Sequence, residues 1–144
     1  MTQEEKELLL KDLSIRLPYG VYIKHTPIGI TGKLNNINVI HIYNNTNSVQ
    51  EVEATTAFFG EDCLDITYFK PYLRPMSSMT EEEIKEFYKI ENILPKVGYI
   101  CPSQDWYFTV NGYDWLNSHH FDYRGLIEHE LAIAITEENN PYKE

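Results

Sequence analysis

Two adjacent histidines and a nearby aspartate lie in the segment with the most side chains capable of chemistry. Residues 115–127 read WLNSHHFDYRGLI and contain His119, His120 and Asp122. Imidazole and carboxylate groups can bind divalent transition metals or act as general acids and bases. Adjacent residues on a helix point in different directions, however, and no HExxH motif occurs. We therefore expect no metal site here.

The chain offers the parts of a hydrolytic site only in a weak form. Cys101 or Ser118 could act as a nucleophile with His119 or His120 as base and Asp122 as its partner. No GxSxG elbow marks a nucleophile, and neither a Walker motif nor GxGxxG is present to hold a nucleotide. His119, His120 and Asp122 are thus weak catalytic candidates. We expect binding rather than catalysis, and no cofactor.

A basic, aromatic segment precedes the three consecutive glutamates at residues 81–83. Residues 69–76 read FKPYLRPM, and Lys70, Tyr72 and Arg74 are our candidates for binding a partner. The two prolines exclude a regular helix and favour an extended strap over residues 70–79. The alternative is that the cations of this strap pair with the carboxylates of residues 81–83.

The segment 115–127 also has a structural interpretation. Its large apolar residues can close the hydrophobic core, and they are Trp115, Leu116, Phe121, Leu126 and Ile127. Asp122 can cap a following helix, while Arg124 can pair with a nearby carboxylate. Arg124 is our fourth candidate for a binding residue, as part of a mixed aromatic and basic surface.

Acidic residues outnumber basic residues across the chain. The 22 Asp and Glu residues against 12 Lys and Arg residues give a formal net charge of −10 at pH 7. This charge repels phosphate backbones, so we do not expect direct nucleic-acid binding. It is compatible with simple solubility or with an inhibitor that imitates nucleic acid. The N-terminus lacks a signal-peptide pattern and no apolar run is long enough to cross a bilayer, so we expect a cytoplasmic protein without membrane contact.

The first predicted element is an amphipathic helix over residues 2–17. Thr2 and Glu5 have the spacing of a capping box, which marks a helix start. Apolar residues then follow at intervals of three and four, namely Leu9, Leu10, Leu13 and Leu17. This stripe predicts packing against the core, with a homodimer interface as the alternative.

Residues 21–69 alternate in polarity and predict a small antiparallel sheet. The expected strands cover residues 21–26, 28–34, 37–43, 49–59 and 64–68. Asn35-Asn36 predicts a hairpin turn, because Asn tolerates the positive φ of a tight turn.

The remaining residues predict helices with short strands between them. Thr80 and Glu83 form a second capping box, and the helix they start should end near Asn92. Residues 97–101 are strand-like. A helix is expected over residues 113–119, a second short helix from Asp122, a strand-like segment over 131–135, and a polar tail over 136–144.

These elements predict one domain of 144 residues with an α+β fold. It would consist of an N-terminal helix, a small antiparallel sheet or partial barrel of four to five strands over residues 21–69, and C-terminal short helices. The strap over residues 70–79 would connect the sheet to the helical part over residues 80–135.

Two strings resemble a known family. FKPYLRPMSSMTEEE at residues 69–83 and WLNSHHFDYRGLIE at residues 115–128 are similar to small uncharacterised proteins of Bacteroides-type gut bacteria and their phages. LPYGV at residues 17–21 is a weaker third match. The resemblance implies no activity, cofactor or catalytic residue. It implies a mobile-element setting, which favours roles in phage–host conflict or regulation over metabolism.

The sequence therefore leads to a hypothesis of binding. We expect a non-catalytic binding or regulatory protein of a phage or mobile element that acts on a host or phage protein. One alternative is an acidic, nucleic-acid-mimicking inhibitor of a host defence system. A second is a small hydrolase or metal-dependent enzyme that uses His119, His120 and Asp122.

Overall fold

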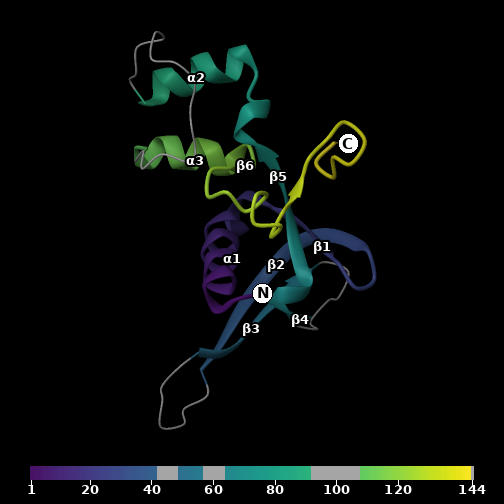
Figure 1. Ribbon diagram of the computed structural model, residues 1–144. Helices are drawn as coiled ribbons and strands as arrows, with labels where there is room; N and C mark the ends of the chain where they lie inside the picture. Colours follow the sequence, from purple (N-terminus) through teal and green to yellow (C-terminus); the bar gives the residue numbers. More distant parts are fainter. Residues whose placement is uncertain (42–48, 57–63, 92–107, 144) are drawn as a thin grey trace.

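An N-terminal helix, a mixed sheet and C-terminal helices make up the fold (Figure 1). The computed structural model describes residues 1–41, 49–56, 64–91 and 108–143. Helix α1 spans Gln3–Arg16, helix α2 spans Glu81–Glu91 and helix α3 spans Val110–Ser118. The α+β class predicted from the sequence is confirmed.

Helix α1 begins at the predicted capping box. The Glu5 amide donates to Thr2 Oγ1 at 3.1 Å, and the Thr2 amide donates to Glu5 Oε2 at 2.7 Å. The leucine stripe packs on the core, with Leu9 and Leu13 fully buried and Leu10 and Leu17 partly buried. After a short 3₁₀ turn, Gly20 takes the left-handed φ of 72° that turns the chain into the sheet.

The sheet has the strand order β4-β3-β2-β1-β5-β6, with β7 also paired to β5. In chain order the strands are β1 (Tyr22–His25), β2 (Ile30–His41), β3 (Val49–Thr56), β4 (Leu64–Asp65), β5 (Phe69–Pro75), β6 (Phe121–Asp122) and β7 (Ile133–Ala134). Neighbours from β4 to β5 are antiparallel, whereas β6 and β7 run parallel to β5. The two short parallel strands make the sheet mixed instead of purely antiparallel.

The turn predicted at Asn35-Asn36 is wrong, because β2 runs through both residues. The chain reverses earlier, between β1 and β2, where Gly29 has a φ of 74° and its amide donates to the His25 carbonyl at 2.8 Å. Against β3, the pairing shifts between Leu34 and Asn36, so one strand carries an extra residue. The asparagine pair interrupts the register without ending the strand, as a β-bulge does.

Residues 70–75 of the predicted strap are extended, but they form a strand inside the sheet, and residues 76–78 form a short 3₁₀ helix. Strand β5 lies between β1 and β6 and connects two hydrophobic clusters, and Figure 1 shows it running from the sheet toward α2. The first cluster joins α1, β1 and β5 and includes Leu13, Ile23, Phe69, Leu73 and Leu126. The second cluster joins α2 and α3 and includes Met76, Phe87, Trp115, Leu116 and Phe121.

Helices α2 and α3 pack together in the second cluster and have side-chain caps. The Glu83 amide donates to Thr80 Oγ1 at 3.2 Å and the Thr80 amide to Glu83 Oε1 at 3.0 Å, which confirms the second capping box. At α3, the Gly112 amide donates to Thr109 Oγ1 at 3.1 Å. The Glu91 carboxylate, at the end of α2, accepts from the Thr109 amide at 3.0 Å and from its hydroxyl at 2.8 Å. The Glu91 carboxylate therefore connects the end of α2 to the start of α3 through hydrogen bonds.

The short helix predicted from Asp122 is wrong in its backbone, because residues 126–130 form turns. Asp122 still accepts backbone hydrogen bonds, from Leu126 and Ile127 at 2.9 Å each. Strand β7 lies within the predicted segment 131–135. The expectations for Asn92 and residues 97–101 lie outside the described residues.

Replacement of Gly112 by alanine should loosen the contact between α2 and α3. An added Cβ would overlap the Glu91 carboxylate, which would then have to leave Thr109. Since hydrogen bonds to a charged group are worth about 1.5–3 kcal/mol, we expect G112A to lower the free energy of unfolding by about 1–2 kcal/mol in urea titrations. Asn111→Ala, at an exposed neighbouring position, is the control and should cost less than about 0.5 kcal/mol. Equal stability of both variants would contradict this role of Glu91.

Candidate functional site

A fully buried ion pair joins α1 to the C-terminal part of the chain. Arg16 Nε donates to Asp12 Oδ2 at 2.7 Å, and both side chains have 0% exposure. Arg16 Nη2 also donates to the Phe121 carbonyl at 2.6 Å. The four-residue spacing of Asp12 and Arg16 brings both side chains to one face of α1. Because buried charges are costly without partners, each group depends on the other and on this carbonyl.

A second arginine shares the same carboxylate. Arg124 Nη1 lies 3.3 Å from Asp12 Oδ1, which confirms that Arg124 pairs with an acidic residue. The same nitrogen donates to the Tyr123 hydroxyl at 3.2 Å, and this hydroxyl donates to Asn117 Oδ1 at 2.8 Å. The guanidinium carbons of Arg16 and Arg124 lie 5.1 and 4.9 Å from the centroid of the Tyr123 ring. The network therefore connects α1, the loop after β6, and α3.

The loop after β6 sets the position of Arg124. Leu126 is fully buried, and its amide is held by the Asp122 carboxylate. Gly125 has a φ of 76°, which a side chain at this position would oppose. Arg124 thus lies on a short turn that is fixed on its C-terminal side.

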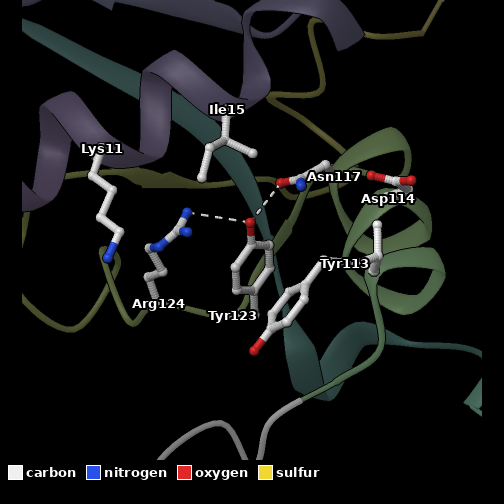
Figure 2. A pocket seen from close by; sticks show the side chains of 8 residues that line it. Lys11, Ile15, Tyr113, Asp114, Asn117, Tyr123 and Arg124 are labelled. Atoms are coloured by element: carbon white, nitrogen blue, oxygen red, sulfur yellow. Dashed lines mark hydrogen bonds between the residues drawn. The ribbon is translucent and has the colours of Figure 1, made fainter.

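A pocket of about 410 Å³ opens beside this network (Figure 2). Its lining residues come from α1, from α3 and from the loop after β6, and they are Lys11, Ile15, Val110, Tyr113, Asp114, Asn117, Tyr123 and Arg124. The volume lies within the range of pockets that hold small ligands or partner side chains. The wall combines cations, a carboxylate, tyrosines, an amide and aliphatic groups, a composition suited to recognition.

His119 and Asp122 have separate structural contacts. His119 Nδ1 lies 2.8 Å from the Trp115 carbonyl oxygen, and its ring stacks on that of Trp115 with the centroids 4.1 Å apart. Asp122, in contrast, holds the amides of Leu126 and Ile127. The two weak catalytic candidates therefore have no common partner among the described residues.

His120 follows the end of α3 and has a third environment. It takes a φ of 63°, and its ring stacks on Tyr142 with the centroids 3.8 Å apart. Burial, followed by the nearby charge of Arg16, lowers the pKa of His120 to about 4. The imidazole is therefore neutral at pH 7. Among the described residues, no three or more His, Cys, Asp or Glu side chains are arranged to hold a metal ion.

Two of the three candidate binding residues in the predicted strap, Tyr72 and Arg74, make contacts within the fold. Tyr72 is 8% exposed, and its hydroxyl lies 3.1 Å from Thr31 Oγ1. Arg74 makes hydrogen bonds of 2.8 and 2.7 Å to the two carboxylate oxygens of Glu83. These bonds hold the pKa of Glu83 at about 2. Lys70 is half-buried and lies opposite Lys24 of β1.

Of the four predicted binding residues, only Arg124 lines the pocket. The ion pair between Arg74 and Glu83 matches the alternative in which the strap pairs with the acidic helix. Sequence reasoning did not identify Lys11, Ile15 or Asn117, whose proximity to Arg124 depends on how α1 and α3 pack. The Asp12–Arg16 spacing was a visible signal, but such pairs on helices are usually exposed.

No family model, curated protein or solved structure matches the chain. In the part of the chain that the structure describes, no helix has both the length and the apolar character needed to cross a bilayer.

The neutral His120 should make folding sensitive to mild acid. Its pKa is about 4 in the folded protein against 6.5 for the free side chain, so the unfolded chain binds the proton first. The contribution to stability is complete above about pH 6.5 and is lost as the pH falls toward 4. After discounting for partial exposure, we expect a fall on the order of 1–2 kcal/mol in the free energy of unfolding across this range.

His120→Asn tests this sign, because asparagine tolerates a positive φ and does not titrate. Urea titrations at several pH values should show a flatter profile between pH 6.5 and 4 for H120N. The loss below pH 4.5 should remain, since Glu83 titrates there. His129→Asn, at an exposed position, is the control. A wild-type profile for H120N would contradict the assignment.

Proposed function

We propose that the protein is a non-catalytic binding protein that recognises a protein partner through the pocket face between α1 and α3. The observation that carries this proposal is the pocket beside the Asp12–Arg16–Arg124 network. Its wall joins a half-buried arginine and two tyrosines to exposed aliphatic side chains. Arginine and tyrosine are enriched among the residues that dominate binding energy at protein interfaces.

Exposed apolar side chains at the pocket support a contact with another molecule. Val110 is 76% exposed and Ile15 is 39% exposed, and both line the pocket. Tyr113 and Tyr123 also line the pocket, and their ring centroids lie 5.2 Å apart. A partner that covered these side chains would bury apolar area and gain binding free energy.

The structural roles of the histidines also favour binding over catalysis. His119 stacks on Trp115, His120 stacks on Tyr142, and Asp122 holds a turn. The resemblance of residues 69–83 and 115–128 to proteins of Bacteroides-type bacteria and their phages suggests the setting. We therefore propose that the partner is a host or phage protein and that binding regulates it.

Site-specific photo-crosslinking tests this binding face. We would place p-benzoylphenylalanine at Val110 and, as a matched control, at Ile28, which is 56% exposed in the turn between β1 and β2. In a lysate of a Bacteroides-type bacterium, irradiation should yield a discrete protein adduct from position 110 and none from position 28. The adduct should be identified by mass spectrometry, and its binding should then be measured with the purified partner.

Binding of the purified partner should weaken about tenfold in Arg124→Gln, because charged hydrogen bonds to the partner are lost, and about two- to fivefold in Lys11→Gln, whose charge lies on the exposed side of α1. Adducts of equal yield at positions 110 and 28 would contradict the proposed face. If neither substitution changes the affinity for the partner but the affinity falls steeply as the salt concentration rises, the result would favour the acidic inhibitor that imitates nucleic acid.

A further inference from the structure

The pocket is a locally positive site in an acidic protein. Asp12 is the only carboxylate paired with Arg16 and Arg124 in the described part of the chain. Lys11 also lines the pocket and forms no ion pair with any described residue, while Asp114 adds one carboxylate. Three cations against two carboxylates leave one net positive charge, although the whole chain carries −10. The pocket therefore matches a ligand group with a single negative charge.

Arg124 has donors available for such a group. Its Nη1 donates to Asp12 and to the Tyr123 hydroxyl. Its Nε and Nη2 make no hydrogen bond to any residue that the structure describes. These two nitrogens form one edge of the planar guanidinium, and such an edge binds a carboxylate through two parallel hydrogen bonds. The contacts of Nη1 with Asp12 and Tyr123 hold the guanidinium in position before a ligand arrives, and the Arg124 side chain keeps 18% exposure.

Asn117 supplies a second donor beside the first. This residue is 1% exposed and lines the pocket. Its Oδ1 accepts from the Tyr123 hydroxyl, whereas its Nδ2 makes no hydrogen bond to a described residue. Figure 2 shows the Asn117 amide directed toward the Tyr123 hydroxyl, on the opposite side of that oxygen from Arg124. Because nearly buried polar groups usually have partners, a ligand carbonyl is the expected acceptor.

Apart from Lys11 and Asp114, the remaining wall is apolar and aromatic. Ile15 lies on the α1 side, Val110 and Tyr113 lie on the α3 side, and Tyr123 lies between the two helices. This wall favours an aliphatic or aromatic group attached to the anion.

We infer that the pocket binds the C-terminal residue of a partner protein, and that this residue has an apolar or aromatic side chain. A chain terminus combines one carboxylate for Arg124, a neighbouring peptide carbonyl for Asn117 and a side chain for the wall of Ile15, Val110 and Tyr113. Lys11 adds attraction for the carboxylate from the rim. This inference rests on the proposed function, since it names the part of the partner that enters the pocket.

N-acetylphenylalanine is the simplest mimic of such a terminus, and its carboxamide is the matched compound without the charge. Titration followed by ¹H–¹⁵N correlation spectra should show saturable shifts with the acid at Asn117, Tyr123 and Arg124. The dissociation constant expected for so small a ligand is on the order of 1 mM. The carboxamide should bind at least about tenfold more weakly. Inorganic phosphate, which lacks the apolar group, should also bind at least about tenfold more weakly.

Three variants separate recognition from a loss of folding. Arg124→Gln should weaken binding of the acid at least about tenfold, and Lys11→Gln, on the exposed side of α1, should weaken it about two- to fivefold. Asn117→Asp keeps an acceptor for the Tyr123 hydroxyl but adds a negative charge to the pocket. Because this charge repels the carboxylate of the ligand, the substitution should abolish detectable binding. Lys85→Gln, on the exposed face of α2, should bind like the wild type.

Equal affinity for the acid and the carboxamide would overturn the role of the carboxylate. Equal affinity for phosphate, with the same dependence on Arg124, would overturn the C-terminal residue in favour of a general anion site. No shift with the acid, combined with a specific adduct at Val110, would overturn the ligand class while leaving the binding face in place. No shift and no specific adduct would overturn both proposals.

Discussion

The rest of the structure depends on one buried carboxylate, that of Asp12, and on the two arginines around it. The pair with Arg16 has no access to water, and the Arg16 guanidinium reaches the carbonyl of Phe121 in β6. Arg124 approaches the other oxygen of the same carboxylate. The cost of burying these charges is offset only while α1, β6 and the following loop keep their relative positions. The ion pair thus defines where the N-terminal helix meets the C-terminal third of the chain.

This arrangement explains how an acidic protein can present a basic recognition site. One carboxylate between two arginines leaves an excess positive charge, and the Tyr123 ring lies close to both guanidinium groups. The same network reaches Asn117 on α3 through the Tyr123 hydroxyl. Arg124 is therefore held by a buried scaffold while part of its guanidinium remains available at the pocket. A recognition group held in this way loses little conformational entropy when a ligand binds.

Local sequence patterns predicted the elements that depend on neighbouring residues. The starts of α1 and α2 followed from Thr2 with Glu5 and from Thr80 with Glu83, because each capping box involves residues three positions apart. The turn predicted at Asn35 was wrong because the local structure there depends on residues far away in the sequence. Its outcome depends on how β2 pairs with β3, which no short pattern encodes.

The candidate site was less predictable than the fold. His119 and His120 attracted attention through their chemistry, but the first stacks on Trp115 and the second on Tyr142. Arg124 was identified from the same segment, whereas Asp12 and Arg16 resembled an ordinary exposed pair on a helix. Their burial results from a contact with Phe121, which is 105 residues from Arg16 in the sequence. Contacts at such separation follow from packing, and sequence periodicity does not reveal them.

A double-mutant cycle on the Asp12–Arg16 pair tests this account most directly. The free energy of unfolding would be measured in urea for the wild type, Asp12→Asn, Arg16→Met and the double variant. We expect D12N to cost about 3–5 kcal/mol, because Arg16 would keep a buried charge without its carboxylate. The double variant should recover at least about 2 kcal/mol relative to the sum of the single variants. Single costs that add to within about 0.5 kcal/mol would show that the two charges do not depend on each other, and would contradict the account.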